Sequence, residues 1–203
     1  MINAVNAVID LASKTSDLKI LDIGSGPGFF ERNIEKNRSN VEIWFSLDIA
    51  KSMVRMQKDF SPMIDVIVAD AEHLPFRDNT FDVVLMSRVI KFIDPEKALR
   101  ESRRVSKKFF ILFADVADTL WAQVMEQFFG IAVDPAVWNN RRTLLSKNIE
   151  NLLRTFFILK VKVHITAMPL SFFNILPSLL SKILNILDKP LLGSRIVCYI
   201  CLK

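Results

Sequence analysis

Over the first 114 residues, short apolar runs alternate with segments in which apolar residues recur at helical spacing. The apolar runs predict strands over residues 18–23, 41–47, 65–69, 81–86 and 109–114. The periodic segments predict helices over residues 2–12, 29–36, 50–58 and 95–105, with Asp94 as the N-cap of the last one. Strands that alternate with helices in this way are typical of a parallel sheet covered by helices on both faces.

Beyond residue 115 this rhythm changes. Residues 118–155 predict two helical pieces separated by Gly130 and Pro135, and strands are predicted over residues 157–166 and 194–202. Between these strands, residues 170–188 predict a helix whose polar residues form only a narrow stripe. Its wide apolar face fits the protein core, a subunit interface or a membrane surface, and its few basic residues favour the first two.

The composition fits one globular domain with an apolar surplus. The chain has 203 residues, of which 51% are hydrophobic and 24% are charged, and its mean hydropathy is +0.28. A surplus of this size needs a thick core, an apolar pocket or a subunit interface, so a homo-oligomer is one expectation. The net charge of +5 is spread along the chain without a nucleic-acid-binding motif, which argues against a nucleic acid partner.

The N-terminus and the cysteines bear on location. The N-terminus lacks the basic start and continuous apolar run of a signal peptide, and no apolar stretch reaches the about 18 residues that a spanning helix needs. We therefore expect a cytoplasmic protein. Cys198 and Cys201 lie three positions apart in a predicted strand, so their side chains should face opposite sides of the sheet. This spacing predicts two buried thiols of a reducing compartment rather than a disulfide or a metal site.

A glycine-rich turn over residues 21–28, with the sequence LDIGSGPG, joins the first predicted strand to the next helix. Ligands of open α/β sheets bind at the carboxyl ends of the strands, where glycines let a ligand approach the backbone and a helix N-terminus favours an anion. The dinucleotide-binding fingerprint would need glycine or alanine at position 29, where this chain has Phe29. The turn therefore predicts a ligand site but argues against a dinucleotide.

Two aspartates follow the next two predicted strands. Asp48 is the last residue of the second strand. Its carboxylate could accept hydrogen bonds from both hydroxyls of a ribose, or it could cap the helix over residues 50–58. Met53 in that helix would cover an adenine ring or belong to the core. Asp70, followed by Ala71, comes after the third strand. Its carboxylate could accept a hydrogen bond from the amine of an adenine, while a backbone N–H donates to a ring nitrogen. Alternatively, Asp70 only forms a turn.

Together, LDIGSGPG, SLDIA and ADAEHLPFRDNTFDVVLMS resemble the class I S-adenosylmethionine-dependent methyltransferases, in particular the group called methyltransferase type 11. The match runs from about residue 18 to residue 114. It implies one doubly wound, Rossmann-like α/β domain over residues 1–203, with a seven-stranded sheet of order 3-2-1-4-5-7-6 and the seventh strand antiparallel. Residues 18–114 would bind the cofactor, residues 115–145 would cap the acceptor site, and residues 146–203 would supply the last helix and strands.

The resemblance also implies S-adenosylmethionine as the cofactor. Asp22 and the glycines of the turn would hold its methionine part, Asp48 its ribose, and Asp70 with Ala71 its adenine, while the residue just past strand four would contact the amino group through its backbone. The implied contact set is Asp22, Gly24, Ser25, Gly26, Gly28, Asp48, Ile49, Met53, Asp70, Ala71 and Ser87.

The expected reaction is in-line transfer of a methyl group to a small-molecule or lipid-like acceptor. The aromatic residues of segment 118–140 would line the acceptor pocket or pack in the core. An RNA or protein methyltransferase, or a non-catalytic adenosylmethionine-binding module, are the alternatives.

No general base stands out. His73 and His164 fit structural roles better, and Asp115, expected just after strand five, is the better candidate. Arg88 and Lys91 lie near the expected mouth of the site, where they could hold an anionic acceptor or only face solvent. The chain departs from the family in having one short helix before the first strand. It also has Ser106-Lys107-Lys108, expected to form a turn, where the family often has glycines.

Overall fold

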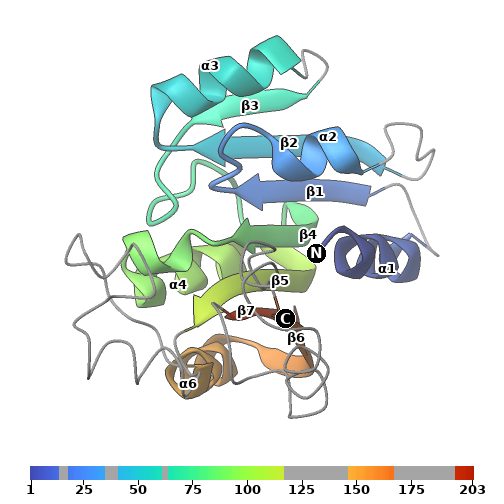
Figure 1. The fold of residues 1–203 in the computed structure, drawn as a ribbon, viewed down its shortest axis with the longest axis vertical. Coiled ribbons are helices and arrows are strands. Elements are labelled where there is room, and N and C mark those ends of the chain that lie inside the picture. The colour runs from blue at the N-terminus through green and yellow to red at the C-terminus, as the bar shows by residue number, and fades with distance from the viewer. Residues whose placement is uncertain (14–17, 35–40, 61–63, 117–145, 167–194) are drawn as a thin grey trace, which may run out of the picture.

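The computed structural model describes residues 1–13, 18–34, 41–60, 64–116, 146–166 and 195–203 (Figure 1). The aromatic residues of segment 118–140 and the apolar helix expected over residues 170–188 lie outside these ranges. The expectations for them therefore stay predictions.

The described segments form helices and strands in the alternation that the hydrophobic pattern predicts. The helices are α1 (Ile2–Ala12), α2 (Phe29–Asn33), α3 (Lys51–Phe60), the 3-10 turn η1 (Ile90–Phe92), α4 (Pro95–Val105) and α6 (Ser146–Phe156). The strands are β1 (Leu18–Ile23), β2 (Val41–Asp48), β3 (Asp65–Val68), β4 (Phe81–Ser87), β5 (Ser106–Val116), β6 (Ile158–Thr166) and β7 (Arg195–Leu202).

All seven strands join one sheet in the order β3-β2-β1-β4-β5-β7-β6 (Figure 1). The five strands from β3 to β5 pair in parallel, whereas β7 runs antiparallel to both β5 and β6. This confirms the predicted order and the antiparallel seventh strand. Because β1, β2, β3 and β4 are parallel, the segments that leave them all start from the same edge of the sheet.

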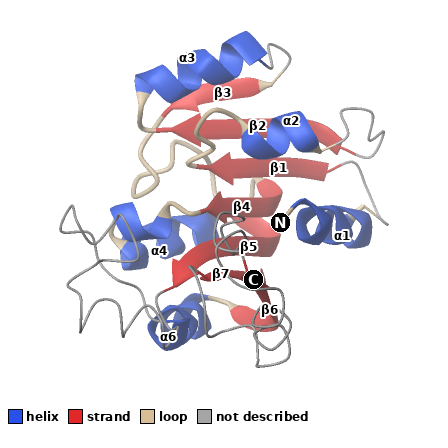
Figure 2. Cartoon of the chain, in the orientation of Figure 1, coloured by secondary structure: helices blue, strands red, loops and turns tan. Residues whose placement is uncertain are grey.

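Helices cover both faces of the sheet, as predicted (Figure 2). Successive residues of the central strands alternate between two cores: Leu21 and Ile23 of β1 face the helices α4 and α6, whereas Ile20 faces α1 and α2. Aromatic pairs join the layers. The rings of Phe30 and Phe113 stack at 5.7 Å on one face, and those of Phe110 and Phe157 stack at 4.6 Å on the other.

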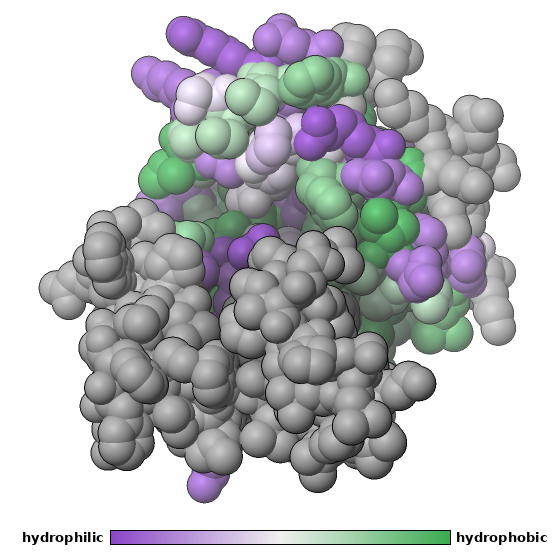
Figure 3. All heavy atoms as spheres, viewed as in Figure 1, coloured by the Kyte–Doolittle hydropathy of each residue, from purple (hydrophilic) through white to green (hydrophobic). Residues whose placement is uncertain are grey.

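The helix α3 shows why the flanking helices are amphipathic. Val54 and Gln57 are buried, whereas Lys51, Arg55 and Lys58 are exposed. In Figure 3 the hydrophilic side chains accordingly gather at the top of the molecule, over α3. A helix with one buried face and one charged face is stable at the edge of the sheet, where one side meets the core and the other meets water.

Most boundaries lie within one or two residues of the sequence-based prediction, and two differ by more. The helix α2 ends at Asn33 rather than at residue 36, because Ile34 already has an extended backbone. The expected turn at Ser106-Lys107-Lys108 is wrong: α4 ends at Val105, and β5 begins directly at Ser106, which pairs with Phe81. The pairing register shifts before Phe109, so a bulge takes up the extra residues that had indicated a turn.

The strand β7 places its two cysteines on opposite faces of the sheet, as predicted. Both thiols are free and buried, with Cys198 in the core under α1 and α2 and Cys201 in the core under α4 and α6. No helix among the described residues is long and apolar enough to span a membrane.

Candidate functional site

The turn between β1 and α2 depends on glycine at three positions. Gly24, Gly26 and Gly28 have φ angles of +67°, +56° and +81°, a region that other residues rarely adopt. A Cβ on Gly24 would lie 2.1 Å from a methyl carbon of Val89, whereas a Cβ on Gly26 would meet nothing within 4 Å. Gly24 therefore lets the turn pack against the segment after β4, while Gly26 borders open space.

The backbone amides of this turn already have acceptors. Gly24 and Ser25 donate to the carbonyl oxygen of Leu47 at 2.8 and 3.0 Å, and Gly28 donates to that of Ser25 at 3.1 Å. Gly26 donates to Oδ2 of Asp48 at 2.9 Å. The turn is thereby tied to the end of β2, and these four amides are not free to bind an anion, contrary to what a glycine-rich turn alone indicates.

Asp48 is half-buried at the end of β2 and joins two segments. Its Oδ2 accepts from Gly26, and its Oδ1 accepts from the backbone N–H of Ala50 at 2.8 Å, just before α3. Each carboxylate oxygen keeps a further lone pair for a hydroxyl group. Next to it, the apolar side chain of Ile49 is 69% exposed, while Met53 is half-buried.

Asp70 forms the turn that follows β3. Its Oδ1 accepts from the backbone N–H of Glu72 at 2.9 Å, and its Oδ2 lies 3.5 Å from Nδ1 of His73. Ala71 beside it is buried, whereas the His73 side chain is exposed within the same turn. The turn-forming role of Asp70 is thus present in the structure, and its role as an adenine ligand stays a prediction.

Asp22, near the end of β1, is the most unusual group at this edge. Its side chain is 1% exposed, and neither carboxylate oxygen has a hydrogen-bond partner among the residues that the structure describes. Burial, the charge and close approach of the Glu31 carboxyl group, and the charge of Asp48 raise the pKa of Asp22 well above its usual value. An unpaired buried carboxylate is costly, so this position fits a cationic ligand group better than a purely structural role.

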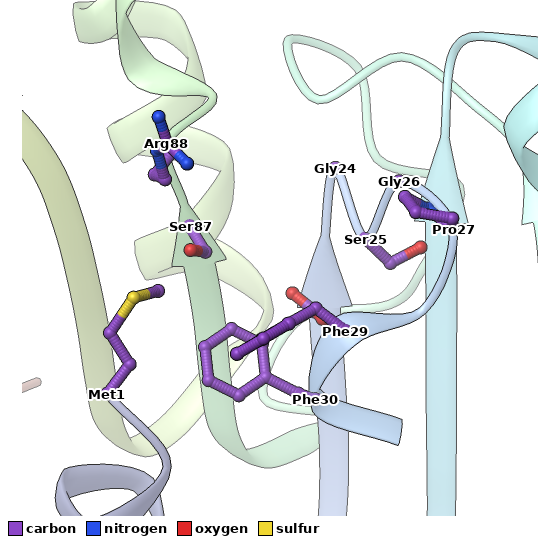
Figure 4. Close-up of a pocket in the computed structure, with 10 residues that line it drawn as sticks. Met1, Gly24, Ser25, Gly26, Pro27, Phe29, Phe30, Ser87 and Arg88 are labelled. Atoms are coloured by element: carbon purple, nitrogen blue, oxygen red, sulfur yellow. The ribbon is translucent and has the colours of Figure 1, made fainter. Parts of the chain in front are cut away.

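Asp22 borders a pocket of about 270 Å³ between the glycine turn and the end of β4 (Figure 4). Its lining comes from the start of α1, the turn, α2 and the last residues of β4: Met1, Asp22, Gly24, Ser25, Gly26, Pro27, Phe29, Phe30, Ser87 and Arg88. Ser87 is the last residue of β4 rather than a residue past it. The pocket brings together five of the predicted contact residues, while Asp48 and Asp70 lie on neighbouring strand ends.

Two buried polar residues, which were not predicted, join helices to the glycine turn and to β2. Gln57 of α3 is fully buried, and its Oε1 accepts from the hydroxyl of Ser25 at 2.7 Å. Glu31 of α2 is 3% exposed and accepts from the Ser46 hydroxyl and, at 3.2 Å, from Nε1 of Trp44. Each is a polar residue at a helix position that faces the core. A polar residue among the apolar positions of a helix was the signal in the sequence that could have identified them.

An ion cluster lies beside the pocket, at the carboxyl ends of β4 and β5. Asp115 is buried within β5 rather than after it, as had been expected. Its carboxylate accepts hydrogen bonds from Nε of Arg88 at 3.1 and 3.2 Å and forms an ion pair with Nζ of Lys91 at 2.9 Å. Two cations therefore occupy the oxygens of Asp115, which argues against this residue as a general base. The side chain of His164 lies outside the described part of the structure.

Known proteins resemble part of this chain in sequence. Residues 21–112 match the family described as a methyltransferase domain. A demethylmenaquinone methyltransferase of Renibacterium salmoninarum is 34% identical over 101 residues, which make up 49% of this chain and 41% of that protein. A mitochondrial arginine hydroxylase of Danio rerio is 38% identical over 88 residues, or 43% of this chain and 27% of that protein. The chain thus spans less than half the length of these relatives.

Among solved structures, magnesium protoporphyrin IX methyltransferase from Synechocystis, with S-adenosylhomocysteine (SAH) bound, superposes with a TM-score of 0.67. Its sequence identity to this chain is 12%, and the superposition covers 100% of this chain and 81% of that one. This likeness reaches the strands beyond residue 112, where the sequence match ends. Residues 21–112 thus match the methyltransferase domain family in sequence, and the sheet order and this superposition show that the chain has the fold of that solved methyltransferase.

Proposed function

We propose that this chain binds S-adenosylmethionine at the carboxyl edge of its sheet and transfers the methyl group to a small-molecule or lipid-like acceptor. The observation that carries the proposal is the unpaired, buried carboxylate of Asp22 beside the pocket. The cofactor has an ammonium group that such a carboxylate would bind, since a buried charge needs a partner of opposite sign. The open space at Gly26 would accommodate the adjoining part of the cofactor.

The other predicted contacts follow from the ends of neighbouring strands. Asp48 would accept the ribose hydroxyls with its remaining lone pairs, and Ser87 would contact the amino group through its backbone. Asp70 and Ala71 would contact the adenine. The exposed side chain of Ile49 and the half-buried Met53 would cover the adenosine, since an apolar side chain at this edge gains from contact with a flat ring.

The chain's part in the reaction would be positioning. The sulfonium of the cofactor supplies an activated methyl group, so alignment of an acceptor atom can account for much of the rate, on the order of 7 to 11 kcal/mol in well-oriented systems. The pocket wall formed by β4 and the glycine turn would hold the methyl donor against the acceptor. No general base is assigned, because Asp115 is engaged with two cations.

The relatives support a small acceptor. Two of them are named as methyltransferases of demethylmenaquinone and of magnesium protoporphyrin IX. The hydroxylase among the relatives carries a different reaction in its name, so methyl transfer itself must be tested. The sequence-based alternatives, an RNA or protein acceptor or binding without transfer, are outcomes of that test.

The test is calorimetric titration of the protein with SAH. We expect the parent to bind with micromolar affinity and Asp48→Asn to weaken binding about tenfold, the value of one hydrogen bond to a charged group. Asp65→Asn is the matched control, because Asp65 is an exposed aspartate at the opposite end of the neighbouring strand. A folded parent that does not bind SAH, or equal losses in the two variants, would contradict the proposal.

If SAH binds, labelled methyl transfer from S-adenosylmethionine should then be measured with quinone-like and porphyrin-like phenols and acids, RNA and protein. Transfer to the small molecules supports the proposal. Transfer only to RNA or protein, or to none of these acceptors, contradicts the proposed transfer to a small-molecule or lipid-like acceptor.

A further inference from the structure

Arg88 has an unusual backbone for its residue type. It follows directly after β4 and has a φ angle of +61°, in the left-handed region that favours glycine. Its N–H donates to the carbonyl oxygen of Phe113 in β5 at 2.7 Å, which holds this conformation in place. Arginine at a position that favours glycine indicates that its side chain has a role at this place.

The side chain of Arg88 is anchored at one end. Its Nε donates to both oxygens of Asp115. The terminal nitrogens Nη1 and Nη2 have no hydrogen-bond partner among the residues that the structure describes. The Arg88 side chain is 58% exposed, compared with 7% for Asp115 and 10% for Lys91. The buried carboxylate thus orients a guanidinium group whose outer edge is available.

The charge of the guanidinium group favours an anion. Asp115 also receives Nζ of Lys91 at 2.9 Å, so its single negative charge is shared and offsets the charge of Arg88 only in part. The planar, fixed fork of a guanidinium group matches the two oxygens of a carboxylate.

Arg88 lies at the end of the pocket that holds the proposed cofactor contacts. It lines the pocket next to Ser87, and Figure 4 shows it beyond the end of β4, across the pocket from the glycine turn. Its partner Asp115 and the neighbouring Lys91 do not line that pocket. The guanidinium group therefore lies between the pocket and the carboxyl end of β5.

We propose that the methyl acceptor carries a carboxylate group and that Arg88 binds it. This inference rests on the proposed methyltransferase function and narrows its acceptor to anionic compounds. Asp115 acts as a positioning residue, since it holds the guanidinium group without contacting the acceptor.

The test uses the full chain saturated with SAH and two probes of the same shape, benzoate and benzamide, in ligand-detected NMR titrations. We expect benzoate to bind about tenfold more tightly than benzamide, the value of one charge-assisted interaction. Arg88→Gln should remove this difference, and Arg88→Lys should keep part of it, because lysine keeps the charge but not the fork. Arg100→Gln is the control, since Arg100 is exposed on α4 and pairs with Glu96 of the same helix.

The affinity of each variant for SAH distinguishes an acceptor-binding Arg88 from a cofactor-binding one. Because Arg88 also lines the pocket proposed for the cofactor, we expect Arg88→Gln to lose more of its affinity for benzoate than for SAH. If this variant loses SAH binding, Arg88 holds the carboxylate of the cofactor and the proposal is overturned. Equal binding of the two probes by the parent, or an unchanged benzoate preference in Arg88→Gln, also overturns it. A parent that fails to bind SAH contradicts the methyltransferase function first, and this inference with it.

Discussion

At the scale of single residues, the burial of Asp22 affects both the stability of the fold and the proposed binding of the cofactor. Its carboxyl group is buried and has no hydrogen-bond partner in the described part of the chain, and burial is the largest cause of its raised pKa, followed by the charge of Glu31. A carboxyl whose pKa is raised on folding stabilises the protein fully only below its unfolded value of about 4. That stabilisation is lost as the pH rises through the folded pKa, so the ligand-free protein should become less stable towards neutral pH.

We therefore predict that Asp22→Asn stabilises the ligand-free protein at neutral pH, on the order of 1 kcal/mol, and weakens SAH binding. The stability gap to the parent should narrow as the pH falls, because both side chains are then neutral. Chemical denaturation at several pH values, with SAH titrations, measures both effects.

Asp82→Asn is the matched control. Asp82 is also a buried aspartate, but its Oδ2 accepts from the backbone N–H of Lys19 at 3.1 Å at the other edge of the sheet. This variant should lose stability and keep its affinity for SAH. Unchanged affinity of Asp22→Asn for SAH would refute the assignment of Asp22 as a ligand group, and a parent as stable at neutral pH as Asp22→Asn would refute the predicted cost of its burial.

At the scale of elements, α4 holds the segment that carries Asp70. Arg104 near the end of this helix donates to the carbonyl oxygens of Leu74 and Phe76 at 2.9 and 2.7 Å and to Oδ1 of Asp78 at 2.8 Å. Glu101 receives the same guanidinium and the backbone N–H of Leu74. The loop after β3 therefore takes its shape from a helix that lies about 30 residues later in the chain.

Arg104→Lys should loosen this loop, because lysine cannot reach several acceptors with one rigid group. We expect a loss of about 1 to 3 kcal/mol of unfolding free energy, together with faster hydrogen exchange over residues 70–78. Arg100→Lys on the same helix is the control and should change neither quantity. Exchange rates over residues 70–78 that match the parent would show that the loop holds its own shape.

At the scale of the whole molecule, the sheet separates two cores that bury the cysteines on opposite faces. Cys198 and Cys201 are both buried, and burial raises the pKa of each thiol to about 12. A thiol reacts as its thiolate, so both groups should be unreactive in the folded protein. Their reactivity then reports whether the sheet with its two helical layers opens.

We predict that an aromatic disulfide reagent at pH 8 reacts slowly with the native protein and titrates two thiols rapidly in guanidinium chloride. The native rate should follow the stability of the whole sheet, since β7 must leave both neighbours before either thiol is exposed. Cys201→Ala should titrate one thiol in denaturant. One fast thiol in the native state would contradict burial on both faces.

The sequence predicted the local elements well because the signals are local. Apolar runs end where glycine or aspartate follows, and Asp94 caps α4 as expected, accepting from the backbone N–H groups of Glu96 and Lys97. The prediction was wrong at Ser106-Lys107-Lys108, where the polar lysines indicated a turn. Pairing with β4 and a bulge extend the strand there, and a bulge leaves no signal in a period of two.

By itself, the sequence determined the strands, most helix boundaries, the opposite placement of the two cysteines and, through the glycine turn and the residues after three strands, the edge where a ligand is expected to bind. These follow from side-chain periodicity and backbone preference, which act within a few residues. Only the tertiary structure decided the pairing of Arg88 and Lys91 with Asp115, the support of Ser25 by Gln57 and the unpaired state of Asp22. These features arise from contacts between residues that lie more than 20 positions apart in the chain. In such contacts, burial and the number of available partners determine the free energy of each polar group.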